Sequence, residues 1–409
     1  MGLFSSIFNR SDPQAALEEP AEGFSEYVYL AIYEALSKGG VRTEAGIAVS
    51  VDTALKNTTV LRCVSLISFA IATLPLFLRE QGTNKRVKGH SLYKILSLKP
   101  NGYQTSFEFK ALMQQWALTY GNAYALIIRR GQKVLQLTPI HPDYITPKLR
   151  TDYRLEYHYK PPNGPNRVFR QDEIFQLRYG LSRDGVTGLS LVKQAAETIG
   201  LGLQADIAAA KLFSNGNIGN GALTTEGKLS PEAYERLKQN IDEYKGAKNA
   251  NRTMILEEGL KFSSSKQTGK ESQHLETRQH QIEEIARVFG VPRPLVGVAE
   301  TAWGSGIDVL GQLFVRYGLM PWFESWEQAI SRALLTDEEA ETLAASFDPQ
   351  ALLKGSPKDQ AEIWAKALGS GGHQGWMNPQ EIRQSSGLEP TDDLPPPPGQ
   401  QKKEGSNDP

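Results

Sequence analysis

The clearest hydrophobic pattern in the chain lies in residues 307–346. Apolar side chains recur there at steps of three and four residues, which is the spacing of one face of a helix: Leu310, Leu313, Phe314, Tyr317, Trp326, Ile330 and Leu334. Pro321 has no amide hydrogen to donate, so the pattern predicts a long helix that is kinked partway along. The segment before it, 292–306, contains two prolines and three glycines and predicts a loop that can change shape.

Helix and strand patterns alternate through residues 46–189. Thr105 and Glu108 have the spacing of a capping box, and the helix that they introduce carries large apolar residues on one side: Phe109, Leu112, Met113, Trp116 and Tyr120. Alternating or β-rich runs then predict strands at 123–130, 133–140, 154–160 and 167–179, with a PPNGP turn before the last. This segment therefore predicts an α+β domain.

Two long helices are predicted on either side of a small inserted unit. The first, 190–216, is rich in Ala and Gly, which permits close approach of another helix. The second, 271–291, has one apolar face formed by Leu275, Ile282, Ile285 and Phe289. Between them, in 217–270, Ser230 and Pro231 are typical of a helix start, and the run TMILEEGLKFSSS predicts a hairpin or a pair of strands.

The two ends of the chain have different patterns. Residues 1–45 predict a flexible arm, and the polyproline and polar residues of 393–409 predict a disordered tail. In 347–392, three capping residues each precede a proline and predict the starts of short helices at Pro349, Pro357 and Pro379.

Composition agrees with an ordinary multi-domain protein. The chain has 409 residues, of which 40% are hydrophobic and 22% charged, so more than one core is expected. The 45 basic and 46 acidic residues nearly cancel, which disfavours a tight non-specific DNA-binding protein. The longest apolar run, Cys63 to Leu78, is too short for a membrane span and is broken by Pro75. The MGLFSS start matches a short myristoylation pattern, which is weak evidence for an anchor.

Candidate enzyme signatures do not reach the spacing that their chemistry requires. The run GALTTEGK, Gly221 to Lys228, has one residue too many between its glycines for a phosphate-binding loop, and Leu229 stands where a hydroxyl would hold magnesium. His274 and His280 are six residues apart and fall on different faces of a helix. The single cysteine, Cys63, lies in an apolar helix and is predicted to be buried. No catalytic, metal or cofactor site is expected.

Five separated motifs resemble those of the portal proteins of tailed bacteriophages, in the same order. They are TTVLRCVSLISFAIATLPL (58–76), YGNAYALIIRR (120–130), GVTGLSLV (185–192), KLFSNG (211–216) and the block 289–335. The similarity covers roughly residues 50–390 and is closest to the compact portals of siphophages.

This resemblance implies an α+β portal fold with named parts. These parts are an α/β wing (46–189), stem helices (190–216 and 271–291), a clip inserted between them (217–270), a tunnel-loop region (292–306), a long kinked wing helix (307–346) and a helical crown (347–392). It also implies a dodecameric ring at one capsid vertex, through which double-stranded DNA is packaged and ejected without sequence specificity.

The same resemblance implies partners and a location. The ring would contact the large terminase, the major capsid protein and neck or adaptor proteins, with no membrane, no cofactor and no enzymatic activity of its own. It would be found in the virion, and in the host cytoplasm during assembly. The alternative is a ring-forming head-tail adaptor or other tail component that conducts no DNA.

The tunnel loop supplies the candidate channel residues that the resemblance implies: Val298, Glu300, Thr301, Trp303, Gly304 and Ser305. Trp303 could instead anchor the loop to its own subunit. Lys245, Lys248 and Arg278 are candidate basic contacts to DNA phosphates, although ordinary solvated charges are the favoured interpretation.

Overall fold

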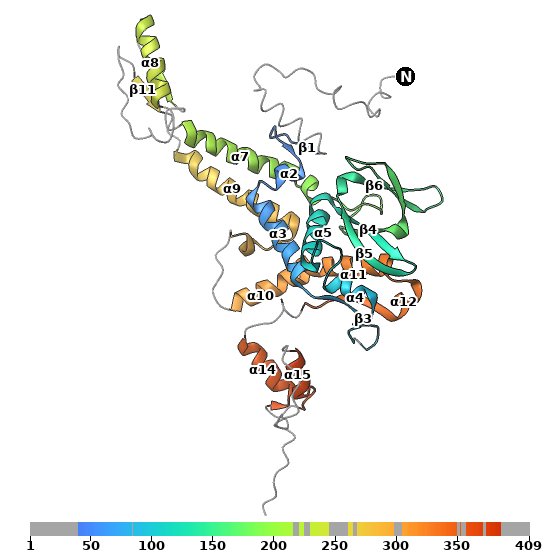
Figure 1. The fold of residues 1–409 in the computed structure, drawn as a ribbon. Coiled ribbons are helices and arrows are strands. Elements are labelled where there is room, and N and C mark those ends of the chain that lie inside the picture. The colour runs from blue at the N-terminus through green and yellow to red at the C-terminus, as the bar shows by residue number, and fades with distance from the viewer. Residues whose placement is uncertain are drawn as a thin grey trace, which may run out of the picture. The chain divides into compact units, whose positions relative to one another are not determined.

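The computed structural model describes residues 40–83, 85–215, 221–224, 230–244, 261–264, 268–297, 305–349, 352, 357–370 and 374–385. The chain divides into two compact units. The first comprises Met1–Glu300 and Tyr317–Phe347, and the second comprises Thr301–Arg316 and Asp348–Pro409. Figure 1 shows their helices and strands.

The first unit begins with a short antiparallel pair, β1 (Val41–Arg42) and β2 (Ala48–Val49), so paired structure starts before residue 46. After α2 (Val51–Ala54) comes the apolar helix α3 (Thr58–Thr73), which Asn57 caps by accepting from two backbone amides. Pro75 follows α3 and precedes β3 (Leu76–Glu80). One face of α3 is buried, which accounts for its apolar pattern.

The predicted capping box at α5 (Ser106–Tyr120) is confirmed. The Thr105 hydroxyl accepts from the Glu108 amide at 3.3 Å, and the Glu108 carboxylate accepts from the Thr105 amide at 2.7 Å. The short helix α4 (Ser91–Ser97) comes before it. Burial on α5 is wider than its apolar stripe predicts, because Lys110 and Gln114 are also enclosed.

Two three-stranded antiparallel sheets follow. The first has the order β5-β4-β9, from β5 (Lys133–Ile140), β4 (Asn122–Arg130) and β9 (Ile174–Arg178); the second has the order β6-β7-β8, from β6 (Ile145–Leu149), β7 (Leu155–Tyr159) and β8 (Arg167–Arg170). Short 3-10 turns, η2 (Pro142–Tyr144) and η3 (Gln171–Glu173), precede β6 and β9. Strands β4, β5 and β7 were predicted. The run 167–179 was predicted as one strand but forms two, β8 and β9, which are separated by η3 and belong to different sheets. Strand β6 was not predicted. Only Ile145 of β6 is buried, so its sequence carries no alternating pattern.

Aromatic residues join these two sheets. Their shared core contains Tyr124, Ile140, Ile145, Tyr157, Phe169 and Ile174. Tyr157 also donates its hydroxyl hydrogen to the Gln176 side chain at 2.8 Å, so the polar end of this buried ring is satisfied.

A second core forms around Trp326 on α11 (Met320–Leu334), a side chain that is 1% exposed. The rings of Phe109, Phe175 and Phe347 lie 6.5, 5.9 and 6.5 Å from it, centroid to centroid. The indole N–H donates to the Gln114 side chain at 2.8 Å, which explains why an amide is buried on α5. Helix α11 therefore ties α5, β9 and the last strand together.

The long helix predicted over 307–346 ends earlier than expected. Helix α10 (Ser305–Leu313) is followed by a π-helical segment (Phe314–Leu319) and then by α11, which ends at Leu334. The irregularity comes immediately before Pro321, whose missing amide removes one helical hydrogen bond, in line with the predicted interruption.

The prediction that this helix continues to residue 346 was wrong. Thr336 caps a separate helix, α12 (Asp337–Thr342), and β12 (Leu343–Phe347) then pairs with β3. Partner pairing and burial of Ala345 and Phe347 override the helical preference of the Leu-Ala-Ala sequence.

The helices α6 (Leu191–Gln194) and α7 (Ala196–Asn215) follow the sheets, and α9 (Thr268–Phe289) lies antiparallel beside α7 (Figure 1). Between α7 and α9, the chain forms β10 (Gly221–Thr224), α8 (Pro231–Tyr244) and β11 (Lys261–Ser264). The predicted start at Pro231 is confirmed. Strand β11 pairs with β10 in an antiparallel arrangement, and α8 lies between the two strands in the sequence. Residues 251–260, the other part of the predicted hairpin, lie outside the described residues.

The second unit contains α10, α14 (Pro357–Ala367) and α15 (Pro379–Ser385). The last two begin at the prolines that the sequence indicated. Asn378 caps α15, because its side-chain oxygen accepts from the Glu381 amide at 2.8 Å. Most of the predicted arm (1–39) and the whole tail (393–409) lie outside the described residues.

Candidate nucleic-acid interface

Most of the predicted channel residues lie outside the described residues. This holds for Val298, Glu300, Thr301, Trp303 and Gly304 of the loop, and for Lys245 and Lys248. Ser305 is the first residue of α10. Their orientation toward a channel therefore stays a prediction, and the geometry concerns the elements that flank them.

The chain enters the loop from a point that is fixed to two helices. A 3-10 turn, η6 (Arg293–Val296), follows α9. The Arg293 guanidinium pairs with the Glu283 carboxylate of α9 at 2.5 Å. The Arg62 side chain on α3 donates to the Leu295 carbonyl at 3.3 Å. The described chain before residue 298 is thus anchored to both α9 and α3.

Arg278 is the candidate basic residue that the structure describes. It lies on α9, and its guanidinium pairs with the Asp206 carboxylate of α7 at 3.2 Å. Both side chains are about half exposed, at 51% and 45%. Arg278 thus links the two helices, and a contact with DNA stays a prediction.

Glycines allow α7 to approach its neighbours closely. A Cβ on Gly200 would lie 2.6 Å from the Thr43 hydroxyl oxygen, and one on Gly202 would lie 3.1 Å from the Asn57 side-chain nitrogen. Gly200 and Gly202 therefore permit close contacts within the chain.

Two segments that are 60 residues or more apart in the sequence meet at a glycine-glycine contact. Gly121 ends α5 with φ +84°, and a Cβ there would lie 2.6 Å from the Leu189 backbone carbon and closer still to the Gly188 carbonyl oxygen. A Cβ on Gly188 would lie 2.7 Å from the Tyr179 amide nitrogen. Neither position has room for a side chain.

Polar side chains stabilise this contact between Gly121 and Gly188, which we call the glycine joint. The Asn122 side-chain oxygen accepts from the Gly188 amide and from the Gln176 side chain, both at 3.0 Å. The Ser190 hydroxyl donates to the Thr119 carbonyl at 2.5 Å and also caps α6. The joint fixes the start of the α6–α7 segment to the first sheet. Nothing in the sequences of the two motifs predicts that they meet.

Comparison with known proteins settles the family. The family model described as phage portal protein matches residues 58–387. The portal protein of Enterobacteria phage HK97 is 33% identical over 353 residues, which cover 84% of this chain and 80% of that protein. This chain belongs to the phage portal protein family. The resemblance found from its motifs is confirmed. The chain is the portal protein of a phage or phage-like particle.

Solved structures share the portal fold. A chain from the neck of a native GTA particle, computed with C12 symmetry, has a TM-score of 0.57 at 24% identity and covers 89% of this chain and 100% of its own. An HK97 family phage portal protein from Corynebacterium diphtheriae has a TM-score of 0.56 at 20% identity and covers 78% and 99%. The predicted α+β portal fold is therefore confirmed.

Residues considered for enzyme chemistry have structural surroundings in this portal protein. Cys63 is fully buried on α3, and burial raises the pKa of its thiol to about 12. Gly221 begins strand β10, and the ring of His280 lies 3.9 Å from the Glu284 carboxylate. Within the described ranges, no cluster of three metal-ligating side chains occurs. Portal proteins as a family have structural roles.

No helix among the described residues combines the length and the apolar character needed to cross a bilayer. The apolar residues of α3 form one buried face of that helix.

Proposed function

We propose that twelve copies of this portal protein form a closed ring at one capsid vertex, and that double-stranded DNA passes through the ring during packaging and ejection. Family membership carries the proposal. A neck structure with C12 symmetry contains a chain of the same fold, which supports the number of copies. Head-to-tail contacts between identical subunits close into such rings.

The order of elements supports an assignment of parts. The antiparallel helices α7 and α9 would be the stem (190–216 and 271–291), and β10–α8–β11 would be the clip (217–270). The two sheets belong to the wing (46–189), with α10 and α11 in the long wing helix. Helices α14 and α15 belong to the crown (347–392), and residues 292–306 form the tunnel loop.

The partners follow from this assignment. The clip would meet the large terminase and later the neck proteins, and the outer surface would meet the major capsid protein. The assembled ring belongs to the virion, after assembly in the host cytoplasm. The energy for DNA movement would come from a separate ATPase, so the purified portal should hydrolyse no ATP.

Electron microscopy of the purified protein tests the ring. Negatively stained particles should show a central hole and about twelve subunits. Particles without a central hole would refute the ring. Rings whose assembled particles contain no DNA would favour a head-tail adaptor instead.

A loop replacement tests the channel role of residues 298–305. We would exchange them for an equally long Gly-Ser sequence, with the same exchange in the N-terminal arm as the matched control. The loop variant should still form rings but should yield few DNase-resistant genomes. Equal packaging in the two variants would refute a role for the loop.

A further inference from the structure

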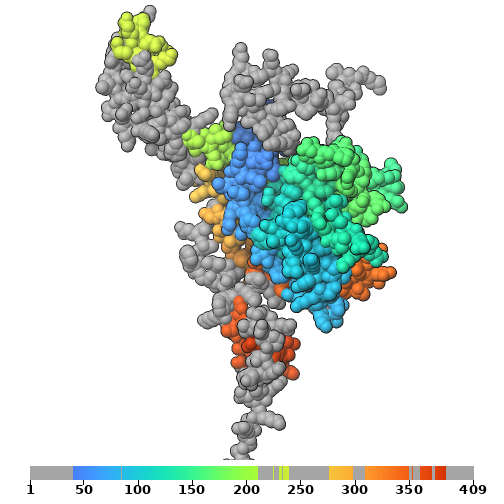
Figure 2. Space-filling view, in the orientation of Figure 1, coloured from blue at the N-terminus to red at the C-terminus, as the bar shows by residue number. Residues whose placement is uncertain are grey.

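One region of this nearly neutral chain is strongly basic. The whole chain has 45 basic and 46 acidic residues. Residues 81–142 contain one acidic residue, Glu108, and nine basic residues: Lys85, Arg86, Lys88, Lys94, Lys99, Lys110, Arg129, Arg130 and Lys133. The part of the surface coloured from light blue to teal in Figure 2 belongs to this region. Such a local excess is the electrostatic footprint of a site for polyanions.

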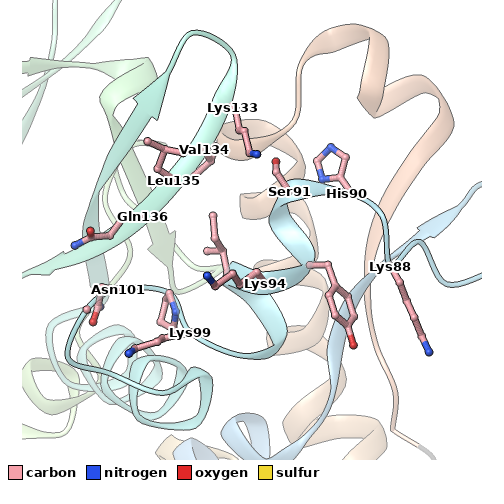
Figure 3. A pocket seen from close by; sticks show the side chains of 14 residues that line it. Lys88, His90, Ser91, Lys94, Lys99, Asn101, Lys133, Val134, Leu135 and Gln136 are labelled. Atoms are coloured by element: carbon pink, nitrogen blue, oxygen red, sulfur yellow. The ribbon is translucent and has the colours of Figure 1, made fainter.

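Four of these lysines line one cavity of about 550 Å³. It opens between α4 with its flanking turns and the β4–β5 hairpin (Figure 3). Its charged lining consists of Lys88, Lys94, Lys99 and Lys133, together with the imidazole of His90, and no carboxylate lines it. The Glu339 carboxylate pairs with the His90 imidazole at 3.0 Å but does not line the cavity.

The lysines come from both walls of this lysine cavity. In Figure 3, Lys133 extends from β5 toward Ser91 on α4, and Lys94 extends from α4 back toward β5, whereas Lys88 points away. All four are exposed. Among the described residues, none of them forms an ion pair with a carboxylate. Their charge is therefore left for a ligand from outside this surface.

The two walls of the lysine cavity are joined by hydrogen bonds in which the lysine side chains take no part. Asn101, which is 5% exposed, donates to the Leu137 carbonyl at 3.0 Å and accepts from the Tyr103 amide at 3.1 Å. The Leu137 amide donates to the Pro100 carbonyl at 2.9 Å. The turn that carries Lys99 is thus bound to β5, so the spacing between the two walls is fixed.

We propose that the lysine cavity binds the phosphate backbone of double-stranded DNA. Its place outside the channel rests on the proposed function, which assigns residues 46–189 to the wing. Lysine binds phosphate as a point charge, and lysine is depleted where proteins bind one another. Lys85 and Arg130 continue the positive charge beyond the cavity, which suits a polymer better than a single small anion. The site would hold DNA at the portal without reading its sequence.

Charge reversal tests the proposal. We would compare the wild type with the triple variant Lys94→Glu, Lys99→Glu, Lys133→Glu, using a fluorescent duplex of about 30 base pairs at increasing salt. The slope of log affinity against log salt should fall by about 3, so raising salt from about 50 to about 200 mM should cost the wild type roughly 60-fold more affinity than the variant. The control reverses three exposed lysines elsewhere, Lys148, Lys160 and Lys193, and should keep more of the slope.

Lysine acetylation with and without the duplex gives a readout on the unaltered protein. DNA should protect Lys94, Lys99 and Lys133 while leaving Lys148 reactive. Equal slopes for both triple variants, or no protection, would overturn the proposal. Protection by inorganic phosphate but not by duplex would make this a small-anion site instead. Equal protection by polyglutamate would indicate an acidic polypeptide. Either result would leave the ring proposal standing, because electron microscopy tests that separately.

Discussion

Lys110 is a buried ammonium whose burial should be visible in the pH dependence of stability. It lies on α5 and is 5% exposed, and its Nζ donates to the Leu74 carbonyl at the end of α3 at 2.6 Å. Burial lowers the pKa of Lys110 from 10.5 to about 8, because the charged form loses its hydration.

The size of the effect follows from this shift. A pKa lowered by about 2.5 units corresponds to about 3 kcal/mol of cost for the charged form. Below about pH 8 the lysine is protonated in both the folded and unfolded states, so this cost is fully present. Between about pH 8 and 10.5 the unfolded state binds more protons, so stability rises with pH. The gain from pH 7 to 9.5 should be about 2 kcal/mol.

Urea unfolding followed by tryptophan fluorescence measures this gain. Lys110→Met should lack it, whereas Lys148→Met, at an exposed site, should retain it. The scan should stop near pH 9.5, because burial raises the pKa of Tyr157 to about 12, and stability from such tyrosines is lost above about pH 10. Parallel pH profiles for the wild type and Lys110→Met would refute the reasoning.

Four further substitutions probe the packing and one surface ion pair. Gly121→Ala should destabilise the folded protein by about 3 kcal/mol or more in urea unfolding, because it adds backbone strain and a clash at the glycine joint. The control is Gly131→Ala, where φ is +62° but the space is open, and it should cost about 1–2 kcal/mol. Equal losses in the two variants would contradict the clash. Trp326→Ala should cost about 3–5 kcal/mol by the same assay, and a loss under about 1 kcal/mol would count against a central role in the core. Arg278→Ala should change stability by less than about 1 kcal/mol, since its ion pair is half exposed; a larger loss would show that the pair is shielded from water.

Local signals in the sequence predicted local structure well. The capping box at Thr105 and the proline starts at Pro231, Pro357 and Pro379 depend on residues within one turn of the helix end, and all four are found. The interruption before Pro321 has the same local origin.

Signals that depend on distant partners were missed. Strand β12 reads as a helix because Leu and Ala favour one, and only pairing with β3, more than 250 residues earlier, makes it a strand. The contact between Gly121 and Gly188 likewise depends on the fold as a whole. The basic region 81–142, by contrast, was readable from the sequence, but the balanced total charge concealed it.

The glycine joint has a mechanical consequence. Side chains deform under load, but at Gly121 and Gly188 backbone meets backbone, and the neighbouring amides and carbonyls are already bonded. A force on the α6–α7 segment therefore reaches the first sheet with little compliance at this contact. Any bending between the two has to occur farther along, and the nearest interruption is Ala195, where α6 ends and α7 begins. The first departure from regular helix beyond the glycine contact is therefore one helical turn away from it, after α6.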